Sequence, residues 1–342
     1  IGARLGMSSK ESARLFAEAR ALATRDATPR MLALLHAAYG QARGFIGEIV
    51  EALELHREAA RLAEATGDPV LTVRLRISLT YAAITAGRFR EALALCERLL
   101  EDVARGMLSP ESRAVGYLRF MHAMLCVDMG RPAEARDELR AAADIAWRNA
   151  DVELLCQVYS FDPVVTRMLG DDAEEAFLRA QRSVELAEYL GSPFVRVFAY
   201  WGIAGAHLLR GDARSAARIL NGVLLFARDH GVALQGEAGI LADLALATIV
   251  RGDGAVALSI AEEAIEVARK RGVGLYECIA QLARVYVLLE TKGAAAADEV
   301  EAALARVHEL IAADGLTSFD AVVRMHCATL ARLEGDHVRA AN

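Results

Sequence analysis

Residues 211–231, GDARSAARILNGVLLFARDHG, decide the fold of this chain because they read as one complete helix between two glycine turns. Apolar residues recur in them at a helical spacing, at Ala216, Ile219, Leu220 and Val223. The segment ends at Gly231, and a glycine there readily adopts the left-handed conformation that closes a helix. The stretch therefore predicts an amphipathic helix of roughly 17 residues whose apolar face needs a neighbour.

Turns of the same kind recur along the whole chain. One series stands 40 to 43 residues apart, at Gly47, Gly87, Gly130, Gly170, Gly211, Gly252, Gly293 and Gly335. A second series lies between them, at Gly67, Gly106, Asn149, Gly191, Gly231, Gly272 and Gly315, where Gly or Asn would take the left-handed conformation. Each period predicts two antiparallel helices that bury their apolar faces only by stacking on the next pair. The predicted fold class is all-α, a right-handed α-solenoid of helical hairpins.

We expect one superhelical domain over residues 1–342. A capping helix is expected at about 9–24, hairpins at about 28–66, 70–105, 110–149, 151–190, 193–230, 233–271 and 274–313, and a partial hairpin at 317–342. The chain lacks an initiator Met and stops just inside an expected helix, so we expect a fragment of a longer protein.

Composition and charge exclude several classes of protein. The net charge is −7, with no basic excess to hold a phosphate backbone, so nucleic acid is not an expected partner. The longest run without a charge has 13 residues, between Arg196 and Arg210, whereas a membrane span needs roughly 20. The five cysteines lie at least 30 residues apart, and no apolar signal segment follows the first residues. These features predict a soluble cytoplasmic protein with reduced thiols and no membrane partner.

The turn Gly-x-x-x-Glu-Ala-Leu at residues 87–93 resembles a tetratricopeptide repeat, although the period here exceeds the usual length of about 34 residues. Such long repeats are similar to the helical sensor arms of maltose-activator-like transcription regulators. Segments 64–69, 191–197, 260–265, 299–304 and 331–336 resemble the C-terminal repeat region of bacterial class III adenylate/guanylate cyclases that carry an ATPase domain. The resemblance implies a regulatory arm, because neither a cyclase nor a nucleotide-binding loop is present in these residues.

The sequence shows no catalytic set, metal set or cofactor motif. The pattern Gly-Asp-Gly at residues 252–254 lies between two expected helices, so we interpret it as a turn and not as a dinucleotide site. Four acids, Asp171, Asp172, Glu174 and Glu175, fall in the first turn of a helix, where they cap free N–H groups. A cation site or acid–base chemistry is the alternative for these four, and an enzyme with an unrecognised site remains a third hypothesis for the chain.

Pro163 falls inside the helix expected at 151–169, where it removes a backbone hydrogen bond. A tolerated bend is one interpretation. The other is a ligand pocket near Pro163, Tyr117 and Trp201, which the neighbouring aromatic residues favour.

In tetratricopeptide solenoids the first helix of each hairpin lines the concave face. Transferring that register to this chain predicts an aromatic and arginine wall for a ligand or partner, made of Arg74, Tyr81, Tyr117, Phe120, Gln157, Ser160, Arg167, Phe198 and Trp201. The same aromatics would alternatively fill the core between repeats, because a longer repeat shifts the inward register.

We therefore expect a non-catalytic regulatory arm of a bacterial signalling protein that binds a peptide, a partner domain or its own upstream domains. The alternative is a small-molecule effector sensor that controls an attached cyclase, ATPase or transcription regulator.

Overall fold

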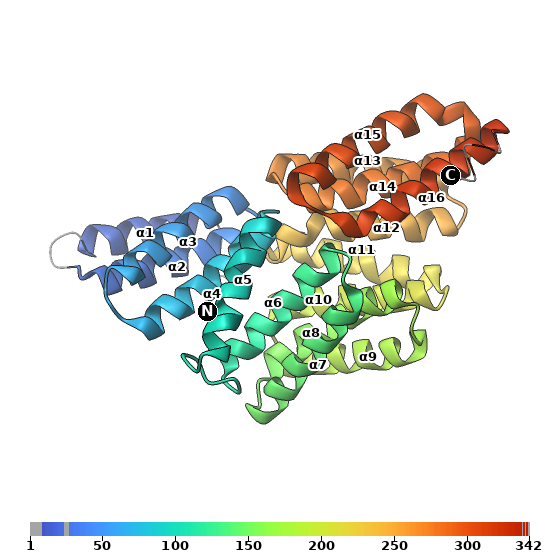
Figure 1. Cartoon of the computed structure of the whole chain (residues 1–342). Coiled ribbons are helices and arrows are strands. Elements are labelled where there is room, and N and C mark those ends of the chain that lie inside the picture. The colour runs from blue at the N-terminus through green and yellow to red at the C-terminus, as the bar shows by residue number, and fades with distance from the viewer. Residues whose placement is uncertain (1–8, 24–26, 337, 339, 341–342) are drawn as a thin grey trace.

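Helices follow one another along the chain in antiparallel pairs (Figure 1). The computed structural model describes residues 9–23, 27–336, 338 and 340. A first helix, α1 (Ser9–Ala23), precedes the pairs. The pairs are α2 (Pro29–Phe45) with α3 (Ile49–Glu64), α4 (Pro69–Thr85) with α5 (Phe89–Ala104), α6 (Arg113–Asp128) with α7 (Pro132–Arg148), α8 (Val152–Leu169) with α9 (Ala173–Leu190), α10 (Pro193–Leu209) with α11 (Ala213–His230), α12 (Glu237–Val250) with α13 (Gly254–Arg271), and α14 (Gly274–Lys292) with α15 (Ala297–Asp314). Helix α16 (Asp320–Glu334) follows.

These bounds confirm the all-α repeat fold and lie within a few residues of the expected helices. Short 3-10 turns, η2 (Leu234–Gly236), η3 (Gly293–Ala296) and η4 (Thr317–Phe319), precede three of the later helices. The expected second helix after Gly335 falls largely outside the described residues. None of the described helices combines the length and apolar character that a membrane crossing requires.

The turn residues behave as the sequence predicts, with one correction. Every glycine of the two series has a positive φ angle. Asn149 was expected to take the left-handed conformation, but its φ is −94° and the next residue, Ala150, takes a φ of 49° instead. The amide of Asn149 explains the difference, because it donates to the carbonyls of Ile145 and Glu111, both at 2.8 Å.

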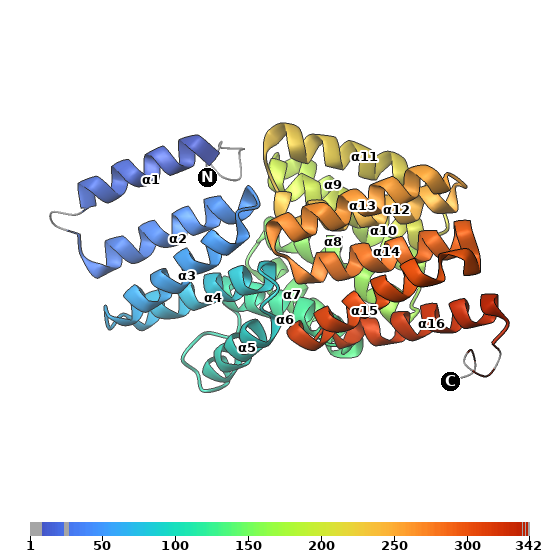
Figure 2. The same ribbon diagram turned by 90° about the horizontal axis from the view of Figure 1, so that it is seen from above.

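The solenoid curls until its first hairpins meet its last ones (Figure 2). One hydrophobic core cluster joins residues of α3–α6, such as Phe89 and Leu125, to residues of α14–α16, such as Leu288 and Leu330. Thr317 Oγ1 donates to the carbonyl of Met129 at 2.9 Å across this seam. Helices α3–α6 and α14–α16 therefore share one buried core.

Candidate ligand cavity

A cavity of about 360 Å³ lies among the first helices of the early hairpins. Helices α2, α4 and α6 supply most of its wall, and α3 adds two residues. Helices α8 and α10 add one residue each, and η2 contributes Gln235 from a distant part of the chain. Helix α2 and η2 are in contact, although some 190 residues separate them in sequence. The cavity is thus built by the curling of the superhelix.

Aromatic and apolar side chains form one part of its wall. Phe45 at the end of α2 and Phe194 at the start of α10 are both buried, and their ring centroids are 4.2 Å apart. Tyr81, Tyr117 and Phe120 continue this surface along α4 and α6. These rings offer a large contact area to an apolar group of a ligand.

His56 of α3 faces the cavity across a glycine. A Cβ atom at Gly40 would lie 3.0 Å from His56 Cδ2, so the glycine leaves room for the imidazole. Burial lowers the pKa of His56 to about 4, and the ring is neutral at pH 7. Its buried Nδ1 has no hydrogen-bond partner within the described part of the chain.

Gln235 enters from η2. Gln235 lies two residues after Ala233, which is fully buried and has a φ of 55°. This left-handed conformation costs a non-glycine residue about 1–2 kcal/mol. The Gln235 residue is 4% exposed, and neither its side-chain oxygen nor its nitrogen finds a partner among the described residues. Leaving buried polar atoms unpaired costs about 1–3 kcal/mol each. A strained turn therefore holds an unsatisfied amide at the cavity wall.

The charges of the cavity are positive. Arg113 is paired with the buried carboxylate of Asp151, and its guanidinium lies 5.7 Å from the centroid of the Tyr117 ring. Burial and the nearby carboxylates of Glu153 and Asp151 raise the pKa of Tyr117, whose hydroxyl makes no hydrogen bond of ordinary geometry within the described structure. Arg74 is exposed and forms no ion pair with a described residue. Of the described residues that line the cavity, none is Asp or Glu.

Five of the nine wall residues expected from the sequence line this one cavity, and four do not. The five are Arg74, Tyr81, Tyr117, Phe120 and Gln157. Phe198 and Trp201 pack at the edge of a hydrophobic core instead, and Arg167 is exposed elsewhere. The Trp201 ring fits against Gly239, and its Nε1 donates to Asp243 Oδ2 at 2.7 Å. The ninth residue, Ser160, lies against the adjacent helix.

Pro163 does not end helix α8. Helix α8 continues through it, and Pro163 is buried. Helix α10 crosses this part of α8 closely, since a Cβ at Gly202 would lie only 2.3 Å from the carbonyl oxygen of Ser160. The cavity is lined by Tyr117 but by neither Pro163 nor Trp201. This cavity therefore does not bring the three residues together, and α10 crosses α8 closely near the interruption.

Sequence reasoning missed several cavity residues, among them those of the first hairpin, the one on η2 and the one at the start of α10. His56 and Gln235 are the main examples, together with Phe45 and Phe194. The glycines at 40 and 44 on α2 were the available signal, because glycine inside a helix marks a close approach.

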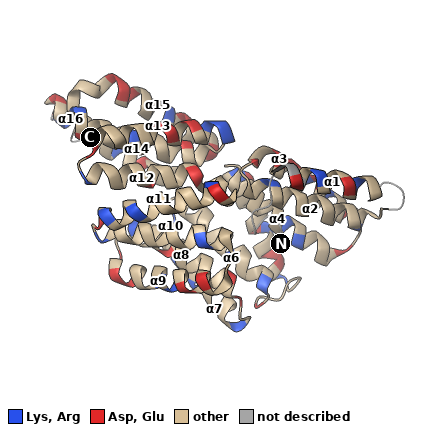
Figure 3. Cartoon of the chain, turned by 180° about the vertical axis from the view of Figure 1, so that it is seen from behind, with Lys and Arg blue, Asp and Glu red and all other residues tan. Residues whose placement is uncertain are grey.

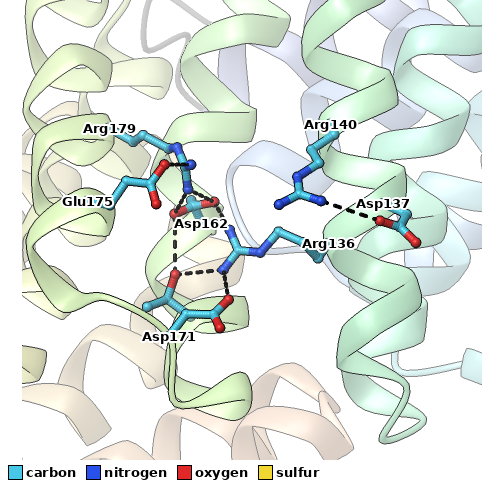
Figure 4. A network of polar contacts seen from close by, with 8 residues as sticks. Arg136, Asp137, Arg140, Asp162, Asp171, Glu175 and Arg179 are labelled. Carbon is cyan, nitrogen blue, oxygen red and sulfur yellow. Dashed lines mark hydrogen bonds and ion pairs between the residues drawn. The ribbon is translucent and has the colours of Figure 1, made fainter.

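The acids at the start of α9 have structural roles (Figure 4). Asp172 caps the helix by accepting from the Glu174 N–H at 2.8 Å, and Glu174 pairs with Arg210 at 3.1 Å. Asp171 and Glu175 contact the buried network that surrounds Asp162 and Arg136. This arrangement supports capping and ion pairing for the four acids.

One group of possible metal ligands occurs among the described residues, His122, Cys126 and Glu134, with ligand atoms within 4.8 Å of one another. The contacts with Cys126 and with Glu138 raise the pKa of His122 to about 10. The imidazole is then a cation at pH 7, with Nδ1 3.2 Å from Glu138 and Nε2 3.8 Å from Cys126. Because Nδ1 of His122 already faces the Glu138 carboxylate, we interpret His122 as the ion-pair partner of Glu138.

Acidic and basic residues are interspersed over the helices (Figure 3). All five cysteines are free, and four of them are buried.

Comparison with known proteins gives matches in structure only. No protein-family model matches the sequence, and no curated protein matches it either. A Rap protein in complex with competence and sporulation factor is similar over 99% of this chain and 91% of its own, with a TM-score of 0.69 and 14% identity. NprR in complex with its cognate peptide NprX is similar over 98% and 97%, with a TM-score of 0.59 and 12% identity.

A third similar structure is a Signal Transduction ATPase with Numerous Domains from Pyrococcus horikoshii that has a tetratricopeptide repeat sensor. The similarity covers 98% of this chain and 52% of that one, with a TM-score of 0.52 and 13% identity. Together with the repeat geometry, these likenesses show that the chain has the fold of a tetratricopeptide-like α-solenoid.

Proposed function

We propose that this chain is a non-catalytic regulatory repeat arm that binds a peptide or a segment of a partner protein in the cavity among α2, α4, α6 and η2. The observation that carries the proposal is the unpaired polar groups of His56 and Gln235 at the wall of this cavity. Buried polar groups in proteins are nearly always paired, so their lack of partners points to a ligand. The similar Rap and NprR structures, which hold a peptide factor, support a peptide.

The position of the cavity gives binding a mechanical consequence. A ligand that contacts both α2 and η2 joins two parts of the array that meet only when the superhelix is curled. Such a ligand binds the curled form better and shifts the population toward it. Domains attached to either end of the arm would sense this change, which is the coupling that regulation requires.

A small-molecule effector is the second candidate. The volume of about 360 Å³ favours it, because ligand pockets begin at roughly 300 Å³. In either form we propose a cytoplasmic arm of a bacterial signalling protein, attached to a cyclase, an ATPase or a transcription regulator. The sensor arm of the similar signal transduction ATPase supports such an attachment.

A displayed random-peptide library tests the proposal. Peptides enriched on the wild-type chain are expected to lose binding to Ser78→Trp, because Ser78 lines the cavity and an indole there fills it. Ser259→Trp, on the exposed face of α13, is the matched control and should bind as the wild type does. Finding no enriched peptide, or equal binding to both variants, would refute peptide recognition at this site.

A further inference from the structure

The cavity differs from a second hollow of the molecule in how its polar groups are satisfied. A hollow of about 430 Å³ among α13, α14 and α15 is lined by Arg269, Arg284 and Arg306. Each of these arginines is paired with a glutamate, Arg269 and Arg306 with Glu277 and Arg284 with Glu299. The charged groups of that hollow are therefore satisfied without a ligand, whereas the cavity near α2 contains polar groups without partners among the described residues.

The first unsatisfied group is the side chain of Gln235. Its side-chain amide has both an acceptor oxygen and a donor nitrogen, and both are buried without a partner among the described residues. One amide group of a ligand satisfies both atoms at once, since its N–H donates to the oxygen and its carbonyl accepts from the nitrogen. The strained conformation of Ala233 fixes the turn that presents this side chain.

The second feature is an exposed guanidinium at the cavity wall. Arg74 lines the cavity without an ion pair to any described residue, Arg113 is already paired with Asp151, and none of the described lining residues is acidic. His56 adds no charge at pH 7, because burial keeps its imidazole neutral. A guanidinium in such surroundings prefers a carboxylate, which it can bind with two parallel hydrogen bonds.

The third feature is the aromatic wall of Phe45, Phe194 and Tyr81 beside these groups. We propose that the cavity binds a carboxylate that carries a neighbouring amide and an apolar side group. This is the chemistry of the C-terminal residue of a peptide and of a free N-acyl amino acid. The inference rests on the proposed function and specifies the end of the ligand that the cavity takes.

Calorimetric titration with four probes tests the inference. The probes are N-acetyl-phenylalanine, the pentapeptide acetyl-Ala-Ala-Ala-Leu-Phe, and the C-terminal amide of each, which removes the charge and keeps the shape. Each acid is expected to bind about tenfold or more tightly than its amide, the range of a charged hydrogen bond. A tighter pentapeptide identifies a peptide terminus as the source of the carboxylate, and equal affinities of the two acids identify the free acylated amino acid.

Two variants separate binding from folding. Arg74→Gln should reduce the affinity for the acids about tenfold and leave the amides unchanged, whereas Arg218→Gln, an exposed arginine of α11, should change neither. Gln235→Leu should weaken every probe and leave the unfolding midpoint unchanged or higher, because it removes an unsatisfied amide. A residue with a merely structural role would lower the midpoint instead.

Equal binding of acids and amides, no binding of any probe at millimolar concentration, or an unchanged affinity in Arg74→Gln would overturn the inference. The proposed function would survive these results if library peptides without a free C-terminus still bind the wild type and not Ser78→Trp. If binding is absent in both experiments, the inference and the proposed function are both refuted.

Discussion

Gly202 of α10 offers the sharpest test of the packing between repeats. A Cβ atom at this position would lie 2.3 Å from the carbonyl oxygen of Ser160 and 2.8 Å from its Cα, both of which belong to the backbone of α8. Backbone atoms cannot rotate away as a side chain does. The two helices would have to separate by about 1 Å to restore ordinary contact, and overpacking of this kind costs about 1–3 kcal/mol.

A glycine-to-alanine change also favours the helix itself, and this gain determines whether the control variant becomes more or less stable. Replacing glycine by alanine inside a helix stabilises it by about 0.5–1 kcal/mol when the new methyl group has room. Gly205→Ala has that room, because its Cβ would lie 3.9 Å from Pro163 Cβ, one turn further along the same helix. We therefore expect Gly202→Ala to destabilise the chain by about 1–2 kcal/mol and Gly205→Ala to be neutral or stabilising.

Urea denaturation followed by circular dichroism measures both free energies of unfolding. A Gly202→Ala chain as stable as the wild type would show that α8 and α10 do not cross as closely as described. Gly222→Ala, which meets nothing within 4 Å on α11, gives the propensity gain alone and completes the series.

Three further perturbations probe other parts of the molecule. Asp162→Asn removes the buried carboxylate that pairs with the buried guanidinium of Arg136 and leaves it the more exposed carboxylate of Asp171. We expect this change to cost about 3 kcal/mol of unfolding free energy in urea denaturation. Arg179→Gln changes a more exposed partner of Asp162 and should cost less than about 1 kcal/mol, so similar losses in the two variants would contradict the buried network. The folded pKa of His56, about 4 against 6.5, means that the unfolded chain binds more protons between these values, so this group withdraws about 2 kcal/mol of stability as pH falls from 7 to 5. In His56→Gln that share of the pH dependence should vanish from the urea midpoints, and an unchanged pH profile would count against a neutral buried imidazole. Ala150→Gly relieves a left-handed alanine and should raise the unfolding free energy by about 1 kcal/mol, while a loss of stability would contradict the φ of 49°.

The sequence predicts the fold well because each repeat is specified locally. The glycine series marks the turns, and the apolar stripes between them mark the buried faces, so the helices fall where they are expected. The left-handed conformation lies at Ala150 and not at the expected Asn149, and this local difference is decided by the hydrogen bonds of one side-chain amide.

The candidate site is only half predictable for a different reason. Tyr81, Tyr117 and Arg74 follow from the inward register of the early first helices. Gln235 reaches the same cavity only through the curl of the whole superhelix, which sums small rotations over several repeats. Trp201 was expected in the ligand wall, but Gly236 and Gly239 leave room for its ring to pack at the edge of the core.

The packing of the first hairpins on the last ones changes how the chain should fold and tolerate truncation. An open repeat array has low contact order, and its terminal units can be removed one at a time with losses that add. Here the buried faces of Leu125 and Phe89 belong to the same cluster as Leu288 and Leu330, so closing the molecule requires contacts about 200 residues apart in sequence. Deleting α14–α16 would expose apolar surface on α3–α6 to water. The stability of the early hairpins therefore depends on the presence of the last helices.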